Sequence, residues 1–100
     1  MILDESDRPK VLIVDDQPEN LAILADMLED MKIDLFVASS GEEALQRLET
    51  NPIDLVLLDI IMPEMDGYTV CETIKNNPKT RDILVVFVSI LYSIEDKLKG

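Results

Sequence analysis

Short apolar runs alternate with longer amphipathic segments along this chain. Each run is rich in branched apolar residues and has an acid, a serine or a turn residue close behind it. Runs of this length and composition predict buried strands, and their lack of polar interruptions favours strands covered on both faces of a parallel sheet. The four predicted strands span residues 10–14, 34–39, 53–59 and 82–89.

Between these runs, apolar residues recur at the spacing of an α-helix. The stripe along the first such segment consists of Leu21, Leu24, Ala25, Leu28 and Met31. Ser40 and Glu43 have the spacing of a capping box, which predicts the start of a helix. The pattern predicts helices over residues 18–32, 39–51 and 68–77, and a further helix that begins at residues 93–96.

Strands that alternate with helices through short connections favour right-handed crossovers and an α/β sheet with helices on both faces. In such sheets, ligands bind beyond the carboxyl ends of the strands. Four polar residues stand at the ends of predicted strands, namely Asp15, Asp16, Asp59 and Ser89. We therefore expect these four candidate site residues to lie at one edge of the sheet.

The charge balance narrows the range of partners. Twenty-one acids and nine bases give a net charge of −12. A charge of this sign repels the phosphates of nucleic acids and anionic lipid surfaces, so we expect direct contact with neither. No apolar run approaches the length of a membrane span, and we expect a soluble protein.

The cysteine and histidine content limits the metal chemistry. Cys71 is the single cysteine, and the sequence has no histidine. An internal disulfide and a thiolate or imidazole metal site are therefore excluded, and any metal must be held by oxygen.

One hundred residues suit a single domain. Residues 1–9 carry acids where a signal peptide needs basic residues, and their apolar part is short. We therefore expect a poorly ordered leader over residues 1–9, a domain over residues 10–100, and a cytoplasmic protein.

Three motifs together resemble the receiver domain of two-component response regulators. "LIVDD", "LLDIIMPEMDG" and "VVFVS" occur in that family's order and at its spacing, and the resemblance extends over residues 10–100. It implies a flavodoxin-like, doubly wound parallel sheet with strand order 2-1-3-4, in which the family's fifth strand and fifth helix are missing. We expect the receiver domain to be incomplete at its carboxyl end.

The resemblance also assigns roles to individual residues. It implies that Asp59 accepts a phosphoryl group from a sensor histidine kinase or a phosphotransfer protein. It assigns Mg²⁺ to Asp16, Asp59 and the backbone carbonyl of Ile61, with Asp15 close by or acting through water. Ser89 would supply the hydroxyl that bonds the phosphoryl group and begins a conformational switch. Such a domain is not an enzyme, although it assists its own phosphorylation and dephosphorylation.

Each of these residues also has an ordinary structural interpretation. Two adjacent acids after a strand often form the solvated start of a helix, and a single acid such as Asp59 often caps a turn. Ser89 alone would be an ordinary hydroxyl at the end of a strand. The joint occurrence of these residues favours a site.

Several departures from the receiver pattern lie near the end of the sequence. The family's fifth-strand lysine is missing, and Lys97 and Lys99 fall in the predicted last helix, so neither is assigned its role. Leu84 stands where the family often has proline, Ile90 stands where it usually has a small residue, and the loop contains Tyr92. A receiver-fold interaction module that no longer phosphorylates is therefore the main alternative.

A third interpretation is a small Mg²⁺-dependent phosphatase or phosphotransferase of another α/β family. It is disfavoured, because "DII" lacks the second acid that such enzymes commonly use two residues after the nucleophile.

The composition of the last predicted strand leads to a prediction about self-association. Residues 83–91 contain no charge, proline or glycine, and without a fifth strand they form an edge with free backbone groups. We expect this edge to pair with a second copy in a two-fold dimer, with Leu84, Ile90 and Leu91 at or near the contact.

Overall fold

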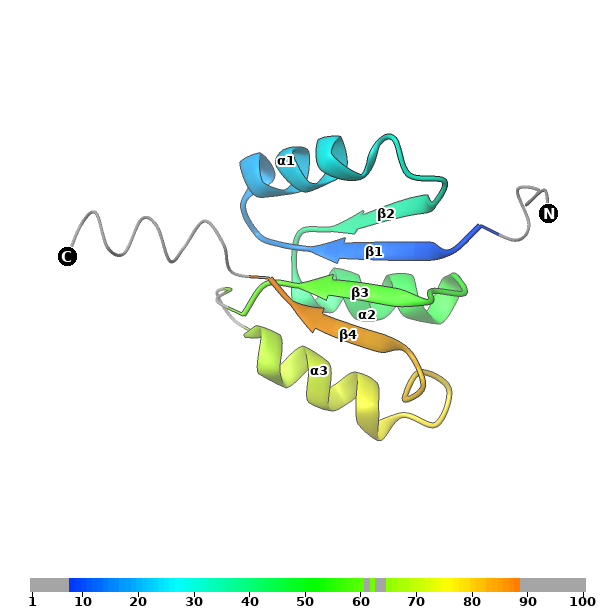
Figure 1. Ribbon diagram of the computed structural model, residues 1–100. Helices are drawn as coiled ribbons and strands as arrows, with labels where there is room; N and C mark the ends of the chain where they lie inside the picture. Colours follow the sequence, from blue (N-terminus) through cyan, green and yellow to red (C-terminus); the bar gives the residue numbers. More distant parts are fainter. Residues whose placement is uncertain (1–7, 61, 63–64, 89–100) are drawn as a thin grey trace.

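The structure is a computed structural model that describes residues 8–60, 62 and 65–88 (Figure 1). Four strands alternate with three helices in these ranges. The elements are β1 (Lys10–Val14), α1 (Pro18–Leu28), β2 (Asp34–Ala38), α2 (Gly41–Thr50), β3 (Leu55–Leu58), α3 (Gly67–Asn76) and β4 (Leu84–Phe87). The predicted last helix and residues 1–7 of the predicted leader lie outside the described residues.

The four strands form one parallel sheet in the order β2-β1-β3-β4. This order confirms the prediction of a doubly wound sheet with strand order 2-1-3-4. The register places Val14 at the end of β1 beside Leu58 at the end of β3. The residues that follow these two strands therefore start from neighbouring points on the same edge of the sheet.

The helices begin within two residues of the predicted positions, but the first helix ends four residues earlier than predicted. Ser40 caps α2 by accepting a hydrogen bond from the Glu43 N–H at 3.1 Å, and the Glu43 carboxylate accepts one from the Ser39 N–H at 2.7 Å. The prediction that the first helix continues to residue 32 is wrong, because turn hydrogen bonds follow Leu28 as the chain reverses toward β2. Met31, assigned to the apolar stripe, lies beyond the helix and is exposed.

One face of the sheet packs against α2 and α3. Leu12 and Val56 are adjacent in register, both are fully buried, and they belong to the main apolar core. Helix α2 lies behind the sheet in Figure 1. The helices contribute to this core with Ala44, Leu48, Val70 and Ile74.

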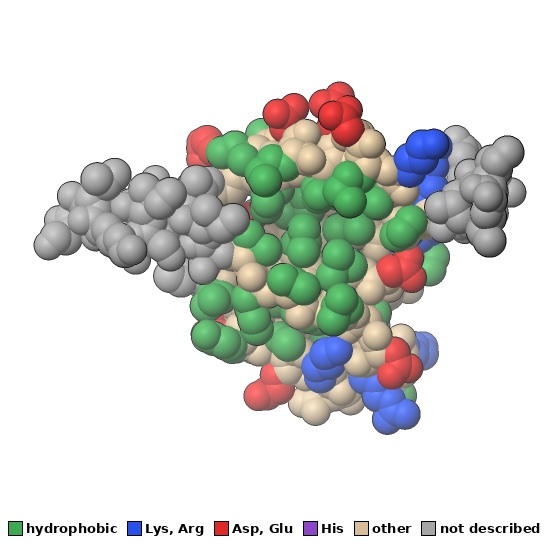
Figure 2. Space-filling model, in the orientation of Figure 1, with side chains coloured by type: hydrophobic (Ala, Val, Ile, Leu, Met, Phe, Trp, Pro, Cys, Tyr) green, Lys and Arg blue, Asp and Glu red, His purple; other side chains and the backbone are tan. Residues whose placement is uncertain are grey.

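The opposite face of the sheet is lightly covered in the described part of the chain. Helix α1 contacts β1 on this side, yet none of its own residues is buried. Four apolar strand residues of this face are exposed, and we call them the apolar sheet face: Leu35, Val37, Leu84 and Val86. Figure 2 shows apolar side chains spread over the middle of this side of the molecule.

The connection from β3 to α3 is closed by Gly67. Its N–H donates to the Ile60 carbonyl at 2.8 Å, so the two ends of the loop meet. A Cβ atom at position 67 would lie 2.3 Å from the Asp59 carbonyl oxygen and 2.8 Å from the Ile60 Cα. Only glycine allows the backbone to approach this closely.

We predict that Gly67→Ala destabilises the protein by about 1–3 kcal/mol, because the added methyl group meets backbone that has to shift. Urea unfolding measures the loss. Gly41→Ala is the matched control, since its Cβ would meet the side chains of Met65 and Val70 rather than backbone. Equal losses in the two variants would contradict this explanation.

Candidate functional site

Three carboxylates meet at the carboxyl edge of the sheet. Asp15 and Asp16 follow β1, and Asp59 follows β3, the neighbouring strand. Backbone hydrogen bonds hold the two segments, since the Asp59 N–H donates to the Val14 carbonyl at 2.9 Å and the Asp15 N–H donates to the Ala38 carbonyl at 3.1 Å. One carboxylate oxygen from each of the three acids lies within 4.8 Å of the others.

The three acids differ in their exposure to solvent. Asp59 is 2% exposed and Asp15 is 5% exposed, whereas Asp16 is only half-buried. Removing carboxylates from water and placing them side by side disfavours their charged forms unless a positive charge or hydrogen-bond donors compensate. The cluster could therefore hold a metal ion, and its oxygen donors suit a hard divalent cation.

Asp15 is held by donors from the first turn of α1. Its Oδ1 accepts a hydrogen bond from the Gln17 N–H at 2.9 Å, and its Oδ2 accepts one from the Asn20 side-chain amide at 3.0 Å. The sequence reasoning did not identify Asn20 as a residue of the site. An aspartate often accepts a hydrogen bond from the backbone two residues on, which is a local signal for the bond from Gln17 but not for the bond from Asn20.

The loop that follows Asp59 is anchored at both ends. Met62 is buried in the main core, and Asp66 caps α3 by accepting a hydrogen bond from the Thr69 N–H at 2.8 Å. The hydrogen bonds from Thr69 lower the pKa of Asp66 below its ordinary value, although the side chain is exposed. These anchors, together with the contact of Gly67 on Asp59, fix the backbone on which the Asp59 carboxylate stands.

Two of the predicted site residues are not tested by this geometry. Ile61 and Ser89 lie outside the described residues, as do Ile90, Leu91 and Tyr92. The described chain reaches Val88, whose N–H donates to the Leu58 carbonyl at 2.9 Å, directly before Asp59. The roles of Ile61 and Ser89 stay predictions.

An aromatic pair lies near the same edge and was not predicted. Tyr68 in the first turn of α3 and Phe87 at the end of β4 have ring centroids 5.1 Å apart, with an angle of 52° between the ring planes. Both rings remain partly exposed. Tilted contacts of this kind stabilise the approach of two elements, and here the pair joins α3 to β4 beside the site.

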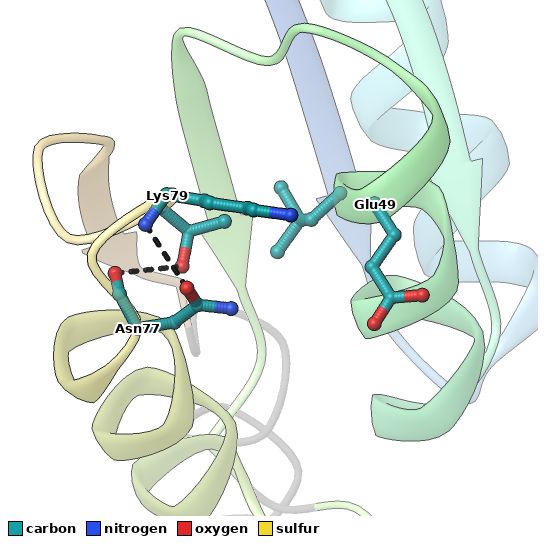
Figure 3. A pocket seen from close by; sticks show the side chains of 5 residues that line it. Glu49, Asn77 and Lys79 are labelled. Carbon is teal, nitrogen blue, oxygen red and sulfur yellow. Dashed lines mark hydrogen bonds between the residues drawn. The ribbon is translucent and has the colours of Figure 1, made fainter.

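A pocket lies at the opposite edge of the sheet (Figure 3). It is lined by Leu48 and Glu49 of α2 and by Asn77, Lys79 and Thr80 of the loop before β4. The Lys79 N–H donates to Asn77 Oδ1, and the buried Thr80 hydroxyl donates to the Ile74 carbonyl of α3. These hydrogen bonds hold the loop, and the pocket lies away from the acidic cluster.

Among the described residues, no helix combines the length and the apolar character needed to cross a bilayer.

Comparison with known proteins identifies a family for almost the whole chain. The family model described as response regulator receiver domain matches residues 11–100. A protein of Vibrio cholerae serotype O1 named probable cyclic di-GMP phosphodiesterase is 43% identical over 100 residues. The signal transduction histidine-protein kinase BarA of Escherichia coli K12 is 40% identical over 79 residues, which are 79% of this chain.

The chain spans only part of these curated relatives, namely 22% of the Vibrio cholerae protein and 9% of the kinase. A solved structure supports the same grouping. The N-terminal domain of a response regulator receiver protein from Methanoculleus marisnigri JR1 superposes with a TM-score of 0.77 at 45% identity, covering 80% of this chain and 65% of that one.

Proposed function

This chain belongs to the response regulator receiver domain family, and on that premise we propose that Asp59 accepts a phosphoryl group from a histidine of a sensor kinase or phosphotransfer protein. The position of Asp59 carries the proposal. Asp59 directly follows β3, is buried, and lies beside two further acids that follow β1. Three carboxylates that crowd together where two neighbouring strands end are costly for packing alone, and they suit chemistry on an anionic group.

The chemistry is a displacement at phosphorus. An Asp59 carboxylate oxygen forms the new bond to phosphorus as the bond between phosphorus and the donor nitrogen breaks, and the donor histidine keeps that electron pair. A carboxylate is a weak nucleophile, so the rate depends on alignment and on neutralising the phosphoryl oxygens. The backbone contacts of Asp59 with Val14 and Gly67 supply alignment.

Mg²⁺ is the proposed cofactor, held by Asp16, Asp59 and the Ile61 carbonyl, with Asp15 alongside. The oxygen donors of the three acids fit a Mg²⁺ ion, which binds through a few carboxylates and waters and through the substrate phosphate. When bound, the ion neutralises charge on the phosphoryl oxygens. Ser89 is proposed to bond the phosphoryl group and to start the conformational switch.

The proposed role is that of a phosphoacceptor rather than an enzyme, and the proposed location is the cytoplasm. Its net charge of −12 supports the absence of direct binding to nucleic acid or anionic lipid. The kinase or phosphotransfer protein is its proposed partner.

We predict that Asp59→Asn abolishes phosphorylation and preserves the fold, because the amide is nearly the same shape but forms no acyl phosphate. The protein is incubated with Mg²⁺ and a small phosphodonor, and mass spectrometry detects an acid-stable, base-labile gain of one phosphoryl group. Asp82→Asn, in an exposed loop, is the matched control and keeps full labelling. Labelling of Asp59→Asn at the wild-type level would identify a different nucleophile.

We predict that Asp16→Ala weakens Mg²⁺ binding at least about 10-fold, as loss of a ligand removes charge and a donor oxygen. Titration calorimetry measures the affinity. The metal-free variant is expected to gain thermal stability, because one of three crowded charges is gone. Glu72→Ala removes an exposed acid from α3 and serves as the control. An unchanged affinity in Asp16→Ala would remove Asp16 from the metal site.

A second proposal concerns self-association, and the exposed edge and face of β4 support it. Strand β4 is an edge in the described part of the sheet, and Leu84 is 61% exposed. An apolar strand with free backbone groups is a template for pairing with another strand. We propose a two-fold homodimer through β4, which also suits the alternative function of a receiver-fold interaction module without phosphorylation.

We predict that Val86→Lys converts this dimer to a monomer, because Val86 lies on the apolar sheet face and a buried ammonium group there would be costly. Sedimentation at high micromolar concentration measures the mass. Asn76→Lys, which adds the same charge at an exposed position of α3, leaves the dimer intact. A stable wild-type monomer at that concentration would rule out the dimer.

A further inference from the structure

The Asp15 carboxylate organises the start of α1. Gln17 is the N-cap residue, but its side chain makes no capping hydrogen bond. Asp15 instead accepts from the Gln17 N–H through Oδ1 and from the Asn20 amide through Oδ2. Both oxygens of this nearly buried side chain are therefore engaged by the first turn of one helix.

Helix α1 is the least buried of the three helices, and its apolar stripe is only half-buried. It buries no residue of its own and leaves Ile23 and Met27 exposed. Most helical stability in proteins comes from packing of an apolar face, and this helix packs weakly. A carboxylate near the N-terminus of a helix is also favoured by the helix dipole. The two Asp15 hydrogen bonds therefore add to this partial packing in fixing the first turn.

The same carboxylate belongs to the proposed metal site. Each carboxylate oxygen has two lone pairs, so a hydrogen bond to each leaves room for an ion or its water on the other side. The Asn20 amide also removes rotational freedom from Asp15 before any ion binds. Without the amide, the Asp15 side chain would lose its rotational freedom only when the ion binds. That entropy cost would weaken Mg²⁺ binding.

We propose that Asn20 is a positioning residue for the Mg²⁺ site, and that Mg²⁺ binding and docking of the first turn of α1 stabilise each other through Asp15. This inference rests on the proposed function, since it assumes that the three acids bind Mg²⁺. Coupling between two sites is reciprocal: an amide that favours the ion implies an ion that favours the docked helix.

The test compares the wild-type chain with Asn20→Leu, which keeps a similar volume and removes both amide donors. Calorimetry measures Mg²⁺ affinity, which is expected to fall about 5-fold or more. Hydrogen exchange of the α1 amides is measured with Mg²⁺ and with a chelator. Mg²⁺ slows this exchange in the wild type and slows it less in the variant.

Two controls make the result specific. Glu19→Gln changes an exposed residue of the same helical turn and is expected to match the wild type in both measurements. Asn20→Ala replaces Asn20→Leu if the leucine variant does not fold, and the wild-type exchange experiment needs no variant.

The outcomes separate this inference from the function on which it rests. A wild-type chain that binds no Mg²⁺ overturns the proposed metal site together with the inference. Binding in the wild type with equal affinity in the Asn20 variants, or with no effect on α1 exchange, overturns the inference alone. In that case, the Asn20 bond serves only to fold the helix.

Discussion

The parallel pairing of β1 with β3 is the constraint on which the site depends. Val14 and Leu58 are partners in register, so the residues that follow them emerge side by side at one edge of the sheet. The strands are held in this register by apolar residues buried on both faces, such as Leu12 and Ile13. A slip of one residue would turn each of these side chains to the other face, which makes the register strongly determined. The positions of the three acids follow from that register.

The crowding of these acids is a cost that the surrounding structure offsets in different ways. Asp15 is bonded to two donors from α1, and Asp16 keeps partial contact with solvent. The backbone of Asp59 is held by Val14 and is in contact with Gly67. A site in which the anionic groups are already in place loses little further freedom when a cation binds, and that is the usual basis of efficient binding by a preformed site. The proposed phosphoryl transfer needs this kind of preparation, because the carboxylate itself is a weak nucleophile.

The two faces of the sheet have different consequences for function. The face under α2 and α3 is a closed apolar core, and it fixes β3 and the loop that follows Asp59. The other face carries α1 and the apolar sheet face, which remain partly exposed in the described chain. The exposed apolar side chains on the face that carries α1 can therefore contribute to binding a partner, whereas the packed face under α2 and α3 keeps the site rigid. The proposed association and the proposed coupling between α1 and the acids both belong to the side that is less tightly packed.

The sequence patterns by themselves determined the element order and the edge at which the acids gather, whereas the strand order came from the resemblance of three motifs to the receiver family. Each of these depends on local information: short apolar runs, helical periodicity, the capping pair Ser40 and Glu43, and acids at strand ends. The same local information failed at Met31, where periodicity continued but the chain had to reverse to reach β2. It also missed the contact between Tyr68 and Phe87, which joins two different elements, and the bond from the Asn20 amide to Asp15, five residues earlier. Only the tertiary structure decided that Tyr68 meets Phe87, that Gly67 contacts the Asp59 backbone, and that α1 buries none of its own residues. These contacts depend on how packed elements meet in space, and the spacing of apolar residues along the chain does not encode which side chains come together.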